Sequence, residues 1–254
     1  MNDPHELIIG YYDDVYPHDS FRNDVSSIRE ELLRRFEDVF SIGKVRVLDL
    51  CTGTGRALSL FCGDTRFDLA GVDISDKMLG KARQNYPEVS FIKGDIRDLS
   101  HAAFKKGYFH CIQMTSVSIQ LFNQSDRKQI FKQVEELLVQ GGVFIFDVFS
   151  EPLEYDAQEK NAFIKRTLMK NDLHVLIIYH RLPFRPPAPS KQYVYLIETR
   201  AGSEPTMSSG VVDIYNVTLD DVVRELEGLG LLAQLLPTNK KNTKFVLIEK
   251  GLKK

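Results

Sequence analysis

Tryptophan is absent from the 254 residues of the chain, and cysteine occurs only three times. Cys51, Cys62 and Cys111 show no Cys-x-x-Cys spacing, so neither a zinc site nor a disulfide framework is indicated. Because each cysteine falls in or beside an apolar segment, we expect reduced, buried thiols, as in a cytoplasmic protein. The sequence predicts no metal site.

Long apolar runs and an excess of one charge are also missing. No segment approaches the roughly 20 apolar residues that cross a membrane, and the polar start lacks the apolar stretch of a secretory signal. The formal net charge of −2, without a basic patch among aromatic residues, argues against nucleic acid as a partner. With 43% hydrophobic residues the chain can form a sizeable core, so we expect one cytoplasmic α/β domain with an elaboration.

What the chain does contain is an apolar run that breaks into a glycine turn. Residues 45–50 have the pattern of a buried strand, and Gly53 and Gly55 follow directly. Glycine permits close approaches that a Cβ would block, so this turn can touch a ligand. Asp49 can accept hydrogen bonds from turn amides or from a ligand ammonium group, and a following helix would offer free N–H groups. Together these features predict a nucleotide-binding crevice.

The glycine spacing separates two classes of nucleotide-binding protein. Dinucleotide enzymes need a small residue three positions after the second glycine, where helix and strand pack closely. Here that position is Leu58. Its bulk disfavours the alternative of a nicotinamide-dependent oxidoreductase.

Two further strand-like segments also end in aspartate. Residues 67–73 end at Asp73, and residues 89–96 end in Gly94-Asp95-Ile96. A carboxylate at the second strand end can hold both hydroxyls of a ribose. An aspartate after a strand can also be only a helix cap or a turn former, but three at successive strand ends favour a ligand site.

With these motifs in this order, the sequence resembles the class I S-adenosylmethionine-dependent methyltransferases over roughly residues 45–150. The resemblance implies S-adenosyl-L-methionine as cofactor, with Asp73 on the ribose, Asp95 and Ile96 on the adenine, and Met114 with Thr115 under the sulfonium. The full set of cofactor-binding residues that it implies is Tyr12, Asp49, Cys51, Gly53, Gly55, Asp73, Ile74, Met78, Asp95, Ile96, Met114 and Thr115. Met78 is equally consistent with a place in the apolar core. One departure is Phe109-His110, where the family often has Phe-Asp.

Helices are expected on both sides of this core. Residues 24–40 have an apolar side typical of an amphipathic helix. Ser75 or Asp76 is expected to cap a second helix, and residues 124–139 form a third that Gly141-Gly142 stops. Residues 144–148 are nearly all apolar, as in a parallel strand that is covered on both faces.

The segment after the fifth strand differs in kind. It contains three or four β-rich stretches, at residues 164–169, 173–182, 191–200 and 211–217, separated by turn-forming residues. Short connections mean antiparallel pairing. Thr218 then caps a helix at 219–229, and two strands near 231–235 and 244–249 close the sheet.

The expected fold is therefore α/β: a doubly wound, mostly parallel seven-stranded sheet of the Rossmann-like methyltransferase type, with an antiparallel β insertion after the fifth strand. We expect an N-terminal lid and helix at 1–40, a cofactor-binding core at 41–150, the insertion at 151–217 as a substrate lid, and the rest of the core at 218–254.

Catalytic candidates come from the lid regions. Tyr12 lies in an aromatic N-terminal segment that, by the resemblance, reaches the cofactor and the acceptor, although it can equally be an aromatic staple against the core. His180 is the candidate general base on an insertion strand. Residues 174 and 180 share one face of that strand and Tyr179 lies on the other, and the sequence leaves open which face lines the pocket.

Two functions remain in view. The favoured one is methyl transfer to an oxygen, nitrogen or carbon atom of a small-molecule metabolite. The alternative is a catalytically inactive methyltransferase-like protein that binds the cofactor as a sensor or assembly partner. Met114-Thr115-Ser116-Val117 stands where methyltransferases of base amines carry an Asn or Asp followed by Pro-Pro and an aromatic residue, which argues against nucleic-acid substrates. The sequence gives no indication of the oligomeric state.

Overall fold

The computed structural model describes residues 4–102, 104–151, 163–182, 188–238 and 242–253. The chain divides into two compact units. The larger unit comprises His18–Pro152 and Val217–Lys254, and the smaller comprises Met1–Pro17 and Leu153–Asn216. The first 17 residues thus group with the inserted strands. The α3 helix, which follows them, belongs to the larger unit.

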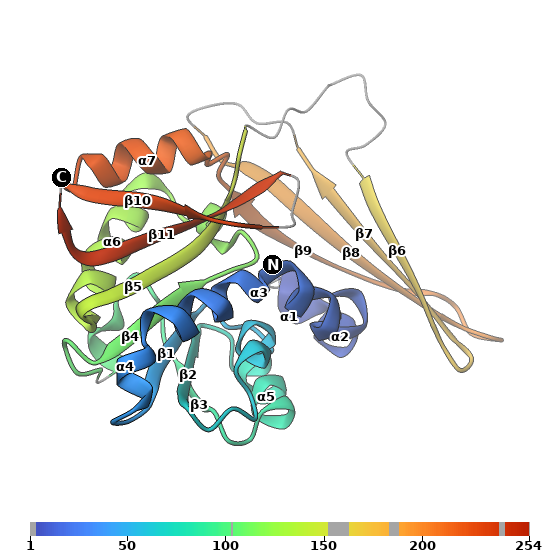
Figure 1. Ribbon diagram of the computed structural model, residues 1–254. Helices are drawn as coiled ribbons and strands as arrows, with labels where there is room; N and C mark the ends of the chain where they lie inside the picture. Colours follow the sequence, from blue (N-terminus) through green and yellow to red (C-terminus); the bar gives the residue numbers. More distant parts are fainter. Residues whose placement is uncertain (1–3, 103, 152–162, 183–187, 239–241, 254) are drawn as a thin grey trace. The chain divides into compact units, whose positions relative to one another are not determined.

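A seven-stranded sheet forms the centre of the larger unit, in the order β10-β11-β5-β4-β1-β2-β3 (Figure 1). Strands β1 to β5 pair in parallel, and β11 is antiparallel to both β5 and β10, so that β10 runs in the same direction as the first five strands. The strands are β1 (Val45–Leu50), β2 (Phe67–Asp73), β3 (Ser90–Lys93), β4 (Phe109–Met114), β5 (Leu138–Phe149), β10 (Leu231–Leu236) and β11 (Thr243–Lys253). This order confirms the expected doubly wound, mostly parallel sheet.

Helices cover both faces of this sheet, which is why its central strands are apolar on both sides. Ile28 and Leu32 of α3 (His18–Arg35) pack in one core cluster with Val47 and Ile145. On the other face, Phe131 of α6 (Gln124–Leu137) contacts Phe144 and Phe146, at ring-centroid distances of 6.1 and 5.8 Å. The remaining helices of this unit are α4 (Glu37–Phe40), η2 (Arg56–Leu60), α5 (Asp76–Asn85), η3 (Leu99–Ala102), η4 (Ser118–Leu121) and α7 (Leu219–Glu227).

Predicted helix caps are confirmed at two places. The Ser75 side chain accepts a hydrogen bond from the amide of Met78 at the start of α5. Thr218 caps α7 and forms a reciprocal capping box with Asp221. Both caps satisfy amide groups that have no partner within their helix.

The N-terminal helix differs from the prediction of one helix at 24–40. It begins at His18, ends at Arg35, and is followed after Phe36 by the separate short helix α4. Phe36 has φ −112° and ψ 29°, outside the helical region, and its side chain is buried in the core cluster beside the sheet. The helix is therefore interrupted at the residue whose side chain, that of Phe36, packs in the core.

The glycine pair at 141–142 does not stop α6, contrary to the prediction. The helix ends at Leu137, and both glycines lie inside β5. Gly141 has φ +74°, and the register with β4 shifts between Phe109 and Cys111, so the pair forms an irregularity of the strand. A Cβ on Gly142 would lie 2.9 Å from the carbonyl oxygen of Val139, which explains why no larger residue fits.

The smaller unit contains an antiparallel four-stranded sheet in the order β6-β7-β8-β9, which confirms the expected insertion. Its strands are β6 (Phe163–Lys170), β7 (Leu173–Arg181), β8 (Ser190–Arg200) and β9 (Thr206–Ile214). The fourth strand was predicted at 211–217 and lies earlier in the chain. Residues 206–209 are exposed and polar apart from Met207, so the sequence alone does not mark them as strand; their pairing with β8 does.

The N-terminal segment packs on one face of this sheet through α1 (Pro4–Leu7), η1 (Ile9–Tyr11) and α2 (Tyr12–Val15). Ile8 is buried with Val175, Ile177, Val194 and Leu196 of β7 and β8. This apolar contact makes the segment part of the smaller unit's own core. Within the described parts of the chain, no helix is both long and apolar enough to span a membrane.

Candidate functional site

The glycine turn after β1 is built by backbone conformations that favour glycine. Cys51, Gly53 and Gly55 have φ values of 55°, 56° and 83°. The amide of Thr52 donates to the carbonyl oxygen of Val72 at 2.9 Å, which ties the turn to the end of β2. At Gly55 a Cβ would also lie 2.8 Å from the Tyr86 ring, so both the angle and the space require glycine.

A short 3₁₀ helix follows the turn where a helix was predicted. It covers only Arg56–Leu60, and Leu58 is fully buried in the core cluster behind it. The small residue that dinucleotide enzymes need is thus replaced by a leucine that packs in the core.

Asp49 is buried at the end of β1 and fixes the turn. Its Oδ2 accepts a hydrogen bond from the hydroxyl of Thr52 at 2.6 Å, whereas its Oδ1 is a buried oxygen without a hydrogen bond. Burial raises the pKa of Asp49 to about 7, against the opposing effect of the Thr52 bond. From the sequence we expected turn amides or a ligand ammonium group as donors to Asp49, and the donor in the turn is instead the Thr52 hydroxyl.

Asp73 joins the end of β2 to the glycine turn. Its Oδ2 accepts the amide of Gly53 at 2.8 Å, and its Oδ1 accepts the amide of Ser75 at 3.0 Å. These two bonds fix the carboxylate at the strand end where the sequence predicts a ribose ligand. The structure therefore brings the predicted ribose ligand and the predicted turn into direct contact.

Around Asp73 the other predicted adenosine ligands fall into two environments. Ile74 is 58% exposed, a high value for a large apolar side chain, whereas Met78 is 3% exposed and packs inward. An exposed isoleucine beside a carboxylate suits an apolar ring as a partner. The burial of Met78 favours the core role that was left open for it.

Asp95 follows β3 and is engaged by a neighbouring cation. The Arg97 guanidinium holds the pKa of the Asp95 carboxyl below its usual range. The backbone amide of Arg97 also donates to Asp95 at 2.9 Å. Ile96, between them, is 3% exposed, so only its backbone is suited to a ligand contact.

The loop after β4 holds two strained residues. Ser116 and Val117 have φ values of 62° and 58°, a conformation that is rare for a β-branched residue. Asp147 of β5 accepts the Val117 amide at 2.7 Å and fixes this backbone. The predicted ligands Met114 and Thr115 lie directly before the loop and are buried.

Sequence reasoning missed three residues here, namely Arg56, Ser116 and Asp147. Arg56, the first residue after the glycine turn, donates through Nη2 to the hydroxyl of Ser116 at 2.6 Å. Asp147 holds the loop after β4 through its bond with the Val117 amide. The only sequence signal for Asp147 was an acidic residue within an otherwise apolar strand.

His110, which departs from the family pattern, has a structural role. Its Nδ1 accepts the backbone amide of Arg46 at 3.0 Å, so a lone pair replaces the expected carboxylate as acceptor. Burial, and secondarily the charge of Arg46, lowers the pKa of His110 to about 4. The ring is therefore neutral near pH 7.

Two of the cysteine thiols are protonated, and none of the three is paired with another. Burial raises the pKa of the Cys51 and Cys111 thiols, so both are protonated near neutral pH. None of the three cysteines forms a disulfide. Over the described part of the chain, no three His, Cys, Asp or Glu side chains gather as a metal site would require.

Tyr12 and His180 both belong to the smaller unit and lie on different faces of its sheet. Tyr12 packs with Tyr16, at 5.0 Å between ring centroids, on the face that carries Val175, Ile177 and Tyr179. His180 follows Tyr179 directly, so its side chain is on the opposite face, where its ring lies 6.2 Å from that of Tyr193. The N-terminal segment thus packs on the face opposite to His180.

Residues 47–142 match a protein family described as a methyltransferase domain. Curated relatives include an uncharacterized methyltransferase of Synechocystis sp., 32% identical over 99 residues, or 39% of this chain and 44% of that protein. A demethylmenaquinone methyltransferase of Chlamydia felis is 34% identical over 99 residues, or 38% of this chain and 40% of that protein. The chain thus spans less than half the length of these relatives.

Solved structures match over nearly the whole chain. A sugar N-methyltransferase from Streptoalloteichus sp., KedS8, has a TM-score of 0.75 at 16% identity and covers 96% of this chain and 92% of its own. An S-adenosylmethionine-dependent methyltransferase from Clostridium acetobutylicum has a TM-score of 0.72 at 20% identity and covers 98% and 99%. At these identities the likeness concerns the fold. Residues 47–142 are thus similar to a methyltransferase domain, and the sheet around them has the fold of these methyltransferase structures, as the motifs implied.

Proposed function

We propose that this chain transfers the methyl group of S-adenosylmethionine to an oxygen, nitrogen or carbon atom of a small molecule. The observation that carries the proposal is the contact between Asp73 and the Gly53 amide. It joins the expected ribose ligand to a turn open to close approach, within a methyltransferase domain.

The proposed cofactor site follows the ends of the parallel strands. Asp73 holds the ribose hydroxyls, with Ile74 against one side of the adenine. Asp95 and the backbone of Ile96 meet the adenine edge. The turn that contains Cys51, Gly53 and Gly55, fixed by Asp49, faces the methionine part, and Met114 and Thr115 lie near the sulfonium. Met78 supports this site from the core.

When bound, the cofactor supplies a methyl group that is already electrophilic. The residues of the chain have to hold the acceptor atom in line with it, at roughly 3–3.5 Å, and to exclude water. An amine acceptor must lose its proton before attack, and a hydroxyl needs a base, for which His180 was the sequence candidate. Tyr12, on the face of the smaller sheet that the N-terminal segment covers, is the second catalytic candidate.

A small-molecule acceptor is supported by the extent of the structural matches. The sugar N-methyltransferase covers the insertion as well as the core, whereas the curated quinone methyltransferase aligns over 38% of this chain. The panel of acceptors to be tested therefore contains both amino sugars and quinols. It distinguishes methyl transfer to a nitrogen atom from methyl transfer to a carbon atom.

The test is methyl transfer from radiolabelled S-adenosylmethionine to fractionated metabolite pools and to that panel. The proposal expects label in a small-molecule product together with one equivalent of S-adenosylhomocysteine. Calorimetric binding of the cofactor without transfer to any acceptor would instead support the sensor alternative. Tight binding of NAD and none of S-adenosylmethionine would overturn both.

A further inference from the structure

The four-stranded sheet of the smaller unit is apolar on both of its faces. One face carries Val175 and Ile177, which are buried with Ile8 of the N-terminal segment. Side chains alternate between the two faces along a strand, so Leu176 and Ile178 belong to the other, second face. Residues that pair directly across antiparallel strands share a face. The apolar and aromatic side chains of the second face therefore include Leu176, Ile178, Tyr193, Tyr195, Ile197 and Met207.

Solvent reaches this second face. The middle of the first face is fully buried, whereas Leu176 and Ile178 in the middle of the second are only partly buried. Met169 and Met207, on the two outer strands of the second face, are 67% and 70% exposed, which is high for large apolar side chains. An apolar surface of this extent that stays accessible on a folded chain marks an interaction site.

The second face carries almost no charge. Among the side chains that the structure describes on the strands of this face, only Lys191 and Asp213 have a formal charge, with histidine counted as neutral, and they pair at 2.6 Å. The rings of Tyr193 and Tyr195 are stacked, with 6.4 Å between their centroids. Aromatic residues and methionine are enriched in the cores of protein interfaces, and charged residues are depleted there. A face without net charge does not repel an identical face, so a second copy of this chain is an electrostatically compatible partner.

The size of the second face also suits a dimer. Strands β7 and β9 have 9 residues each. At about 3.4 Å per residue and about 4.8 Å between strands, four such strands present a flat area of roughly 600 Å². The relief of the side chains makes the accessible area larger than this, and each partner of a standard interface buries about 800 Å². Two of these faces packed together therefore fall in the size range of a specific protein–protein interface.

We propose that two copies of this chain form a dimer by packing the second faces of their four-stranded sheets against each other. The contact is isologous, so each copy contributes the same residues, related by a two-fold axis. Sheets packed face to face lie about 10 Å apart, and the side chains of their inner faces interdigitate into a shared apolar core. The dimer forms without cofactor or acceptor and is therefore independent of the proposed function.

Sedimentation equilibrium of the full chain tests the proposal at concentrations of about 1 to 100 µM, which bracket a micromolar dissociation constant. We expect the mass to rise with concentration toward that of two chains, or to be that of two chains throughout. The mass of one chain at every concentration would overturn the proposal. Flotation with phosphatidylcholine vesicles is measured alongside, because a monomer that binds vesicles through this face would assign the face to a lipid surface instead.

Two lysine substitutions test whether the second face forms the contact. Ile197→Lys, in β8, would bury two unpaired ammonium groups in the dimer, so the dissociation constant should rise by roughly a hundredfold or more. Met207→Lys, on the outer strand β9, should raise it roughly tenfold. Since Met207 is 70% exposed, this variant leaves the core of the single chain intact and decides the test if Ile197→Lys does not fold.

Ile42→Lys is the matched control. Ile42 is 90% exposed and lies before β1 in the larger unit, so the variant adds the same charge outside the second face. Its dissociation constant should stay within about twofold of that of the unchanged chain. A dimer that persists unchanged in Met207→Lys, or one that is weakened equally in Ile42→Lys, would overturn the assignment of the interface.

Discussion

Tyr12 and His180 lie on opposite faces of one four-stranded sheet, with Tyr179 next to His180 in the chain and beside Tyr12 in the core. An acceptor bound on one face is therefore out of reach of the other side chain. The face with Tyr12 also carries Tyr11, whose hydroxyl donates to Glu198. Burial, and then this bond, raises the pKa of Tyr11 to about 12, so its hydroxyl stays protonated.

We predict that Tyr12→Phe impairs methyl transfer more than His180→Gln does. Loss of one hydrogen bond costs about 0.5–1.5 kcal/mol, so kcat/KM for the acceptor should fall roughly two- to tenfold in Tyr12→Phe. His180→Gln should stay within about twofold. Steady-state kinetics with Tyr193→Phe, a control on the His180 face, checks this. A larger loss in His180→Gln would assign the acceptor to that face.

Asp73→Ala should weaken binding of S-adenosylhomocysteine by about 1–3 kcal/mol, the range for losing hydrogen bonds to a charged group. The variant loses the proposed ribose ligand and also the support of the Gly53 amide. Asp73→Asn keeps one acceptor oxygen and should lose less. Calorimetry measures both, and unchanged affinity in Asp73→Ala would remove Asp73 from the site.

Asp49 should make the protein less stable as the pH rises. Its pKa in the folded chain, about 7, lies above the usual value of 3.8, so folding favours the protonated form. Its contribution is complete below pH 4 and is lost as the pH rises through 7. Asparagine does not titrate, so Asp49→Asn removes this contribution. Between pH 4 and pH 8 the unchanged chain should lose ~2–4 kcal/mol more unfolding free energy than Asp49→Asn does. Urea titrations at both pH values measure it, with exposed Asp68→Asn as control.

His110 should make the protein less stable as the pH falls, the opposite of the effect of Asp49. Its pKa of about 4 in the folded chain lies below the usual 6.5, so folding favours the neutral ring. Its contribution is complete above pH 6.5 and is lost as the pH falls through 4, by up to ~3 kcal/mol. His110→Gln, whose amide oxygen can still accept from Arg46, should flatten acid denaturation in this range. An unchanged acid transition would contradict the assignment.

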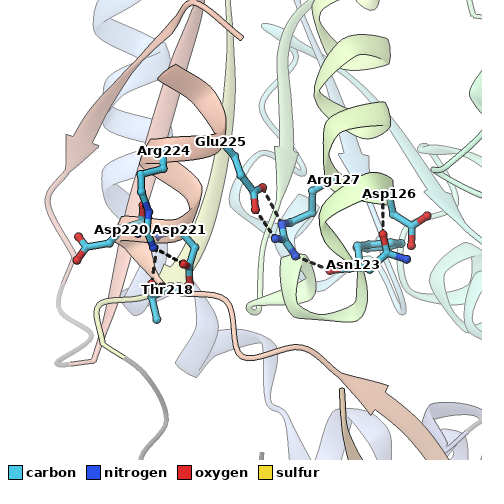
Figure 2. A network of polar contacts seen from close by, with 9 residues as sticks. Asn123, Asp126, Arg127, Thr218, Asp220, Asp221, Arg224 and Glu225 are labelled. Atoms are coloured by element: carbon cyan, nitrogen blue, oxygen red, sulfur yellow. Dashed lines mark hydrogen bonds and ion pairs between the residues drawn. The ribbon is translucent and has the colours of Figure 1, made fainter. Parts of the chain in front are cut away.

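A buried ion pair between Arg127 and Glu225 joins α6 to α7, as Figure 2 shows. The side chains are 6% and 5% exposed, and Arg127 Nε lies 2.9 Å from Glu225 Oε2. Arg127 also donates to the carbonyl oxygen of Phe122 at 2.7 Å, in the loop that follows β4. Removing one partner leaves a buried charge alone.

Arg127→Met should therefore cost about 3–5 kcal/mol of unfolding free energy. The double variant Arg127→Met/Glu225→Met should recover most of that loss, because neither charge is then buried unpaired. Chemical denaturation of the single and double variants measures both values. A double variant as unstable as the single one would show that the geometry of the pair, and not its charge, supports the helices.

The parts predicted correctly from the sequence are those that short-range patterns determine. Asp73 and the Gly53 turn could be found because strand periodicity and turn residues are local signals. The Val117–Asp147 contact could not, because it joins residues 30 positions apart whose pairing depends on the order of β4 and β5. Gly141 has the sequence pattern of a helix stop, and only pairing with β4 shows that it lies within a strand.

The position of β9 at the edge of its sheet explains why its first residues were not predicted as a strand. β9 is the last strand of its sheet and pairs only with β8, so its first residues face water and carry no apolar alternation. The arrangement of Arg56 and Ser116 was likewise invisible, because a serine with positive φ has no sequence signature.

The packing of Ile8 against Val194 and Leu196 has a consequence for how the chain folds during synthesis. At about 5–20 residues per second, the ribosome needs roughly 10–40 s to make the strands on which Ile8 packs. During that interval Ile8 lacks the strand residues on which it packs in the folded protein. The smaller unit therefore completes its core late in translation, once β8 has been made.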